Sequence, residues 1–324
     1  MSRLDETWKS GLIPNVLRSW GIVPDAVSPI SANGNQHWKV RRSSDEFVLR
    51  MYRRAQTDSS IRYELDLLQW LSRRGWPVAA AVDGMAIVDS SLVFVLFPLL
   101  PGRSAANETT EQLRRRGRIL AELHRELSAI TGIGQRIGWQ RSDEVVRSVL
   151  ADSRPGGELV CRLTQHLEHV AERLRAAGAS SFPTGVIHGD FIAQNLLFQG
   201  DKLSGVIDFD SAHLDLRAVD LACARRSGGD EVARGYLEIF PLADSELDCL
   251  DDLWRASVLR YFLQILERKA VTGTEASELE WCLRQVEKTR RSIVSLDDLC
   301  DVRTGFASQR MNRRGRAESH VEIG

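Results

Sequence analysis

Three polar side chains in one short stretch of the sequence could bind a divalent cation and orient a hydroxyl group. Asp190 follows the dipeptide His188-Gly189, and Asn195 comes five residues after Asp190. A later strand-like run ends at Asp208, the first residue of the tripeptide D-F-D. Carboxylate and amide oxygens are hard ligands that suit Mg²⁺. The alternative is a polar hairpin, because Asp and Asn are also common in turns.

Strand-like runs surround these side chains and predict the elements that hold them. The runs cover residues 186–187, 196–198 and 203–207, and a polar turn occupies residues 199–202. This pattern predicts a strand, a loop, a second strand, a turn and a third strand. The polar side chains would then stand at strand ends, beside a cleft.

The block H-G-D-x₄-N followed by I-D-F-D resembles the catalytic loop and metal-binding segment of the aminoglycoside phosphotransferase and choline kinase-like family. The protein kinases carry the comparable signatures H-R-D-x₄-N and D-F-G. The resemblance covers roughly residues 28–290 and is strongest at 186–220, and the chain is also similar to homoserine kinase-like members of the superfamily. It implies an α+β, bilobal, protein-kinase-like fold with a small β-rich lobe and a large, mainly helical lobe.

The resemblance gives each polar side chain of the motif a role. Asp190 would be the catalytic base, which accepts or orients the proton of the acceptor hydroxyl. Asn195 and Asp208 would bind Mg²⁺ against the phosphates of a nucleotide. Asp210 is either a further metal ligand or a carboxylate that caps a turn.

Two other residues would support the catalytic loop without touching the reacting atoms. Asp220, in the run VDLACA, resembles the family aspartate that accepts hydrogen bonds from the loop backbone. A helix N-cap is the alternative for this residue. His188 would hold the loop through hydrogen bonds rather than transfer protons, because a lone histidine is usually structural.

The amino-terminal third would bind the nucleotide. Arg50, in the strand-like run FVLRMY, stands where the family usually has a lysine for the α- and β-phosphates, and a guanidinium also contacts phosphate oxygens. An ordinary surface arginine is the alternative. Glu64 would pair with Arg50, as in the lysine–glutamate pair of kinases. Asn33 and Gly34 lie where a phosphate-covering loop should be. The apolar and hinge residues that would hold the adenine are Val40, Phe97, Leu99, Leu197 and Ile207.

Hydrophobic patterning predicts the same division of the chain into lobes. Strands are expected at 37–40, 47–51, 86–88 and 92–97, with one helix at 61–72 between them. Thr109 and Gln112 predict a capping box, and helical patterns dominate from there onward, apart from the motif. We expect residues 1–97 to form the nucleotide-binding lobe with an N-terminal helix, 98–102 a hinge, 103–302 the helical lobe with the catalytic loop and acceptor site, and 303–324 a polar basic tail.

Composition narrows the class of protein. The chain has 324 residues, a net charge of −1 and 43% hydrophobic residues, so no global charge favours nucleic acid or a membrane surface. The first ten residues contain no apolar signal core. Five dispersed cysteines suggest reduced thiols rather than disulfides or a zinc site. A cytoplasmic protein is the plain expectation, and the oligomeric state stays open.

These observations predict a kinase that uses ATP and Mg²⁺ to phosphorylate a hydroxyl of a small molecule. The acceptor is left open between an aminoglycoside-type antibiotic (which would imply antibiotic resistance), homoserine, choline and a sugar. Two alternatives share the fold: a protein Ser/Thr kinase and a nucleotide-binding pseudokinase without turnover. Only eleven residues separate Asp208 from Asp220, which leaves no evident platform for a peptide. The intact motif argues against the pseudokinase, and Arg50 is the one feature in its favour.

Overall fold

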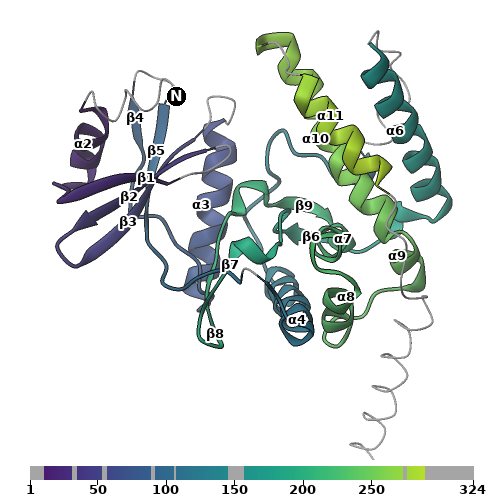
Figure 1. Cartoon of the computed structure of the whole chain (residues 1–324), viewed down its shortest axis with the longest axis horizontal. Coiled ribbons are helices and arrows are strands. Elements are labelled where there is room, and N and C mark those ends of the chain that lie inside the picture. The colour runs from purple at the N-terminus through teal and green to yellow at the C-terminus, as the bar shows by residue number, and fades with distance from the viewer. Residues whose placement is uncertain are drawn as a thin grey trace, which may run out of the picture. The chain divides into compact units, whose positions relative to one another are not determined.

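The structure is a computed structural model that describes residues 11–30, 35–52, 57–88, 92–105, 107–144, 157–272 and 276–288. The chain divides into two compact units. The first contains Met1–Ala105, Gly132–Gly138 and Gln194–Asp210, and the second contains Ala106–Thr131, Trp139–Ala193 and Ser211–Gly324. One unit is built on a β-sheet and the other mainly on helices, which confirms the predicted α+β class (Figure 1). The predicted hinge and lobe boundaries stay a prediction.

The first unit contains a five-stranded antiparallel sheet with the order β1-β2-β3-β5-β4 (Figure 1). Its strands are β1 (Ala26–Ile30), β2 (Gln36–Arg42), β3 (Asp45–Met51), β4 (Ala86–Val88) and β5 (Leu92–Pro98). Its helices are α2 (Leu12–Leu17), which continues into the 3₁₀ turn η1 (Arg18–Trp20), and α3 (Asp58–Arg73).

Alternation along β2 and β3 gives the sheet two different faces. Trp38, Val40 and Leu49 point into an apolar core that they share with residues of α2, including Ile13 and Leu17. Side chains alternate between the faces of a strand, so the residues between them in sequence point the other way, toward the side of the buried α3 residues. Burial of each such large apolar side chain contributes about 1.5 to 3 kcal/mol, which fixes the register of the strands.

A short ribbon of two strands completes the first unit. It consists of β7 (Leu196–Gln199) and β8 (Lys202–Val206), with an irregular register between Leu197 and Phe198. Gly205 allows the close pairing, because a Cβ at this position would lie 2.8 Å from the Leu197 side chain. Backbone hydrogen bonds attach the ribbon to the unit, from Val206 N to Pro77 O at 2.8 Å and from Arg103 N to Phe198 O at 3.0 Å.

The second unit is mainly helical. Its strands β6 (Thr184–Ile187) and β9 (His213–Leu216) pair antiparallel, and a 3₁₀ turn, η3, covers Ala179–Ser181. Two more 3₁₀ turns lie where the chain passes between units, η4 (Ala193–Asn195) and η5 (Phe209–Ser211). Its helices are α4 (Thr110–Leu127), α6 (Glu158–Ala176), α7 (Arg217–Gly228), α8 (Asp230–Leu237), α9 (Asp244–Asp248), α10 (Leu250–Thr272) and α11 (Ala276–Glu287).

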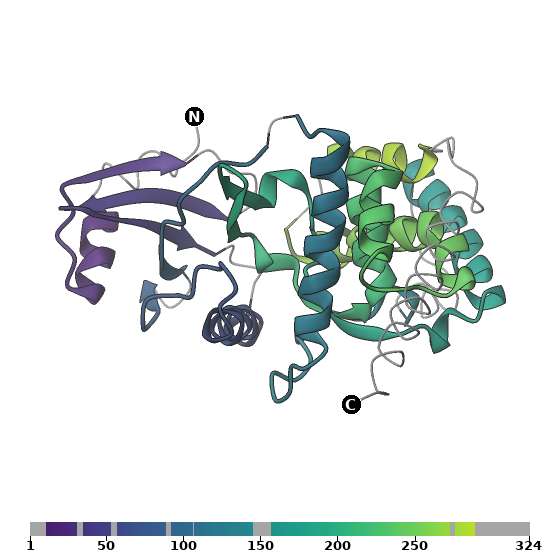
Figure 2. The same ribbon diagram turned by 90° about the horizontal axis from the view of Figure 1, so that it is seen from below.

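Helix α4 begins at the expected capping box. Gln112 N donates to Thr109 Oγ1 at 3.3 Å, and Thr109 N donates to Gln112 Oε1 at 2.8 Å. Helices α4 and α8 then lie side by side (Figures 1 and 2). Their contact depends on glycine, because a Cβ at Gly117 would lie 1.9 Å from Val232 O and one at Gly235 would lie 1.9 Å from Arg114 O.

The motif region differs from the expected ribbon in one respect. Its three strands form as predicted, but β6 pairs with β9, whereas β7 and β8 pair with each other. The prediction missed β9, whose sequence H-L-D-L follows soon after the D-F-D tripeptide. A nearby antiparallel partner therefore takes up the backbone hydrogen bonds of β6.

Some predicted features fall outside the described residues. These are Asn33 and Gly34 of the phosphate-covering loop and the tail at 303–324. Of the helices the structure describes, none combines the length and the apolar character needed to cross a lipid bilayer.

Candidate active site

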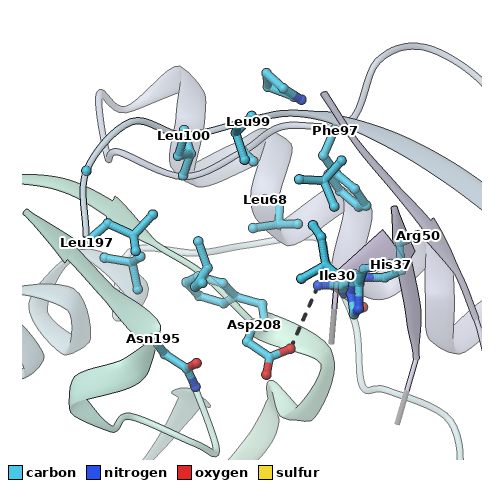
Figure 3. A pocket seen from close by; sticks show the side chains of 18 residues that line it. Ile30, His37, Arg50, Leu68, Phe97, Leu99, Leu100, Asn195, Leu197 and Asp208 are labelled. Atoms are coloured by element: carbon cyan, nitrogen blue, oxygen red, sulfur yellow. Dashed lines mark hydrogen bonds and ion pairs between the residues drawn. The ribbon is translucent and has the colours of Figure 1, made fainter. Parts of the chain in front are cut away.

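A cavity of about 480 Å³ lies within the first unit (Figure 3). Its walls come from β2, β3, α3, the end of β5 and the ribbon β7–β8, so residues far apart in the sequence meet there. Most of the residues that the sequence singled out for nucleotide and metal line it. These are Arg50, Glu64, Phe97, Leu99, Asn195, Leu197, Ile207 and Asp208.

Val40 is an exception, because it lies in the apolar core on the opposite face of the sheet and is fully buried there. In β3 it is Val48 that lines the cavity. From the sequence we expected Val40 to contact the adenine. Side chains alternate between the two faces of a strand, so Val40 lies on the same face as Trp38 and not on the face of the cavity.

Arg50 is held by three groups in the cavity. Its Nη1 lies 2.6 Å from Glu64 Oε1, and its Nη2 lies 3.8 Å from Asp208 Oδ1 (Figure 3). Its Nε donates to His37 Nε2 at 2.9 Å. The guanidinium carbon also lies 5.3 Å from the centre of the Phe97 ring. The expected pair with Glu64 is therefore present.

Burial and charge act in opposite directions on Arg50. Burial is the strongest single influence and disfavours the cation, but the neighbouring charges, led by Glu64 and joined by Asp208 and Asp210, together outweigh burial and raise the pKa of Arg50. Glu64 is itself 1% exposed, so each charge needs the other. The result is a permanent cation that faces Asp208 and can bind the oxygens of a phosphate.

Asp208 combines an exposed carboxylate with an uncommon backbone conformation. Its side chain is 41% exposed, and its φ of 69° lies in the left-handed region. Such a conformation costs of order 1 kcal/mol in a non-glycine residue and is concentrated at functional sites. Here it turns the carboxylate toward the cavity, on the same side as the amide of Asn195 (Figure 3).

The donor set of this site fits Mg²⁺. Asp208 offers a carboxylate and Asn195 an amide oxygen, and a kinase site needs only one or two protein carboxylates beside the phosphates. Within the described ranges, no three His, Cys, Asp or Glu side chains gather into a closed metal site. Asp210 takes a different position: its Oδ2 accepts a hydrogen bond from Asn35 Nδ2 at 3.3 Å, and the residue does not line the cavity.

Two residues near the Arg50–Glu64 pair were not predicted from the sequence. His37 stands directly opposite Arg50 in the β2–β3 register, so the alternation of two expected strands could have found it. Arg136 comes from the segment Gly132–Gly138, which belongs to the first unit although it follows α4. It is 1% exposed and donates from Nε to Ser60 Oγ of α3 at 2.8 Å. Nothing in its local sequence marks this contact.

The segment His188–Asp190 lies in the second unit, where Asp220 supports it. The Asp220 carboxylate accepts hydrogen bonds from His188 N at 2.7 Å and from Gly189 N at 2.8 Å. Its Oδ2 also lies 3.1 Å from His124 Nε2. These are the backbone contacts that the sequence led us to expect. The N-cap alternative is wrong, because the N-cap of α7 is Leu216.

Gly189 and His188 shape the loop before Asp190. Gly189 has a φ of 82°, and a Cβ on it would lie 2.4 Å from Ser211 O. Only glycine fits both the conformation and the space. His188 is fully buried, and its Nδ1 accepts a hydrogen bond from Asp190 N at 3.2 Å. The ring thus supports the backbone of the loop, as expected for a structural histidine.

The acidic stretch after Pro241 lies at the starts of two helices, with Asp244 and Glu246 in the first turn of α9 and Asp251 and Asp252 in the first turn of α10. Glu246 is buried and accepts a hydrogen bond from Ala243 N at 2.8 Å. Asp252 is buried as well, with Arg173 Nε at 2.7 Å. These carboxylates cap and pair within the fold. Further along the chain, Trp281 packs edge-on against Tyr261 and is 43% exposed.

Comparisons with known proteins identify the family of this chain. The profile of the phosphotransferase enzyme family matches residues 26–256. The chain belongs to this family, which confirms the prediction of an enzyme that phosphorylates a hydroxyl of a small molecule.

The curated relatives of this chain include two homoserine kinases. A homoserine kinase of Rhizobium johnstonii is 30% identical over 253 residues, which span 71% of this chain and 76% of the relative. A homoserine kinase of Agrobacterium fabrum is 27% identical over 253 residues, with the same coverage of both chains.

Solved structures share the fold at lower identity. A microcompartment-associated aminopropanol kinase superposes with a TM-score of 0.63 at 19% identity, covering 85% of this chain and 94% of the other. An amicoumacin kinase, in complex with AMP-PNP and Ca²⁺, superposes with a TM-score of 0.64 at 13% identity, covering 87% and 94%. The kinase-like fold expected from the motif is therefore confirmed.

Proposed function

We propose that this protein transfers the γ-phosphoryl group of ATP to the hydroxyl of a small amino alcohol, with homoserine as the first candidate. The observation that carries the proposal is the cavity in which the Arg50–Glu64 pair, Asn195 and Asp208 meet. It holds a fixed cation and a metal-type donor set beside an apolar wall, which suits a nucleotide triphosphate. The choice of homoserine rests on the curated relatives.

In this proposal, different residues of the cavity bind different parts of the nucleotide. Val48, Phe97, Leu99 and Leu197 provide apolar surface for the adenine. Arg50 binds phosphate oxygens, while Asn195 and Asp208 hold Mg²⁺. When bound, that ion neutralises charge on the phosphates. For Asp210 we favour a carboxylate that caps a turn over a metal ligand, because its side chain accepts a hydrogen bond from Asn35.

Asp190 acts on the acceptor in this proposal. Its carboxylate orients the acceptor hydroxyl and takes its proton as the oxygen attacks the γ-phosphorus. The new O–P bond forms while the bond from the γ-phosphorus to the bridging oxygen breaks, and ADP leaves with the electron pair of that bond. Positioning and charge neutralisation supply most of the rate in such transfers. The support for Asp190 is its place in the motif and the Asp220 contacts that fix the loop before it.

A panel of acceptors tests the proposal. ADP release would be measured with ATP, Mg²⁺ and one of homoserine, aminopropanol, choline, a hexose or an aminoglycoside. We expect release to depend on homoserine or another small amino alcohol, with a phosphorylated acceptor detected by mass spectrometry. Turnover confined to an aminoglycoside would overturn the acceptor and favour an antibiotic-modifying enzyme. ATP binding without turnover on any acceptor would favour the pseudokinase.

We also propose a cytoplasmic location. All four cysteines in the described part of the chain are free thiols. Burial raises the pKa of the Cys282 thiol to about 12, and that of Cys223 to about 12 as well, so these thiols stay protonated and unreactive. Such thiols persist in a reducing compartment.

A further inference from the structure

We propose that His37 is a positioning residue that allows an arginine to serve as the phosphate-binding cation of this site. The inference rests on the proposed function, because it assigns a task to a neighbour of Arg50 in the nucleotide cavity. His37 and Arg50 face each other across β2 and β3, and both side chains line the cavity. The Arg50 Nε to His37 Nε2 distance is 2.9 Å.

The chemistry of arginine explains why such a partner is needed. A lysine ammonium is one compact charge, so a single carboxylate fixes it adequately. A guanidinium is a plane with three nitrogens, and its orientation decides which N–H groups reach a ligand. In this protein Glu64 holds one terminal nitrogen and His37 holds Nε. Two anchors fix the plane, and the remaining nitrogen, Nη2, is the one that faces Asp208.

The histidine must present a lone pair to do this. A neutral imidazole has one donor and one acceptor nitrogen. The Nε2 atom faces the N–H of Arg50, and the ring also hydrogen-bonds to the backbone of Asn35. This backbone bond raises the pKa of His37, which is the effect of a carbonyl oxygen that accepts a hydrogen bond from the ring N–H. The other ring nitrogen thus carries the hydrogen, and Nε2 is left to accept.

The surroundings of His37 agree with a neutral ring. Burial and the charge of Arg50 disfavour the imidazolium and lower its pKa to about 4, while Asp210 opposes them. A glutamate in place of His37 would add a second buried carboxylate beside Glu64, and an apolar side chain would leave the Arg50 Nε without this acceptor. A neutral acceptor orients the arginine without cancelling its charge.

The test compares His37→Leu in two backgrounds by measuring the Kd of ATP with Mg²⁺. In the wild-type background we expect ATP affinity to fall about ten-fold, the usual effect of losing a hydrogen bond to a charged group. In the Arg50→Lys background, where no Nε–H needs an acceptor, the same change should alter affinity by less than about two-fold. His37→Gln offers an amide oxygen as acceptor and should recover most of the affinity. Lys39→Leu, on the same strand, is the matched control.

Imidazole ¹⁵N NMR adds a readout that does not need nucleotide. We expect the His37 ring in the wild-type chain to show the hydrogen on Nδ1, and its Nε2 signal to move in Arg50→Lys. An equal loss of affinity in both backgrounds, or no loss in either, would overturn the positioning role. If the wild-type chain did not bind ATP, the proposed function would fail, and an Nε2 signal indifferent to Arg50→Lys would separately overturn this inference.

Discussion

At the scale of single residues, the site is organised around one buried charge. The guanidinium of Arg50 stays charged because Glu64, together with the more distant Asp208 and Asp210, offsets the desolvation cost. Removal of one partner of such a pair costs more than the pair contributes, because the remaining charge is stranded in a poorly solvated place. Phosphate binding and local stability therefore depend on the same contact.

Glu64→Gln tests this coupling. The amide keeps the shape of the side chain but removes its charge, so we expect the free energy of unfolding to fall by about 1 to 3 kcal/mol and kcat/KM for ATP to fall at least about ten-fold. Glu46→Gln is the control, because Glu46 pairs with Lys39 on the exposed part of the same sheet. That exposed pair should be worth less than about 1 kcal/mol. Equal effects of the two changes in chemical denaturation would contradict the coupling.

A second prediction at the scale of single residues concerns Gly189. Gly189→Ala forces a Cβ against Ser211 O in a backbone conformation that L-residues avoid. We expect a loss of about 2 to 4 kcal/mol in stability, and a loss of activity from the displaced loop. Gly134→Ala is the comparison, since its φ of 73° is equally unfavourable but no atom lies within 4 Å of the added Cβ. A smaller effect at Gly189 than at Gly134 in thermal unfolding would refute the role of close packing.

At the scale of elements, the segment Gly132–Gly138 contacts α3 although the two are far apart in the sequence. Arg136 reaches Ser60 through Nε, and its guanidinium carbon lies 5.8 Å from the centre of the Tyr63 ring. Burial lowers the pKa of Arg136, and the charge of Glu64 opposes this. The arginine thus anchors the segment Gly132–Gly138 to the first unit and adds positive charge behind Glu64.

Arg136→Ala is expected to lower the free energy of unfolding by about 2 to 4 kcal/mol, because it removes a buried hydrogen-bonded cation and leaves a void. Arg73→Ala, in the exposed last turn of α3, should change it by less than about 0.5 kcal/mol. The comparison is made by urea denaturation. A neutral result for Arg136→Ala would mean that the segment is held by its backbone alone.

The β9 strand carries a buried histidine that predicts a pH effect. Burial, together with the neighbouring Arg260, lowers the pKa of His213 in the folded protein. Below pH 6.5 the unfolded chain therefore binds a proton at this residue that the folded chain resists, so stability falls as the pH is lowered.

The measurement is the free energy of unfolding between pH 7 and pH 5.5, above the range where most carboxylates titrate. We expect the wild-type chain to lose about 1 kcal/mol more stability over this range than His213→Gln. His169→Gln, on the exposed side of α6, should follow the wild-type curve. Parallel curves for wild type and His213→Gln would show that the ring does not resist protonation.

At the scale of the whole molecule, the sequence predicts what is local and loses what depends on distant partners. The capping box of α4 and the strands around Arg50 follow from short-range patterns, the loop contacts of Asp220 were expected from the family resemblance, and all are present. The pairing of β6 with β9 does not follow, because strand partners are chosen by the tertiary fold.

In the candidate site, too, contacts between residues that are distant in the sequence were the ones not predicted. Glu64 was found because its motif partner is known, whereas Arg136 arrives from a segment 72 residues further along the chain that carries no motif. Val40 was expected at the adenine but lies in the apolar core on the other face of the sheet, because the face of a residue depends on its position in the alternation of the strand.

The most direct test of the central claim follows a labelled γ-phosphate from ATP to the acceptor. In the presence of Mg²⁺ and homoserine, or the amino alcohol selected by the panel, we expect stoichiometric transfer to the acceptor hydroxyl. Asp190→Ala should reduce the rate at least about a thousand-fold, whereas Asp201→Ala, in the exposed turn between β7 and β8, should leave it unchanged. Label that appeared only in inorganic phosphate, or transfer that survived Asp190→Ala at the wild-type rate, would contradict the account.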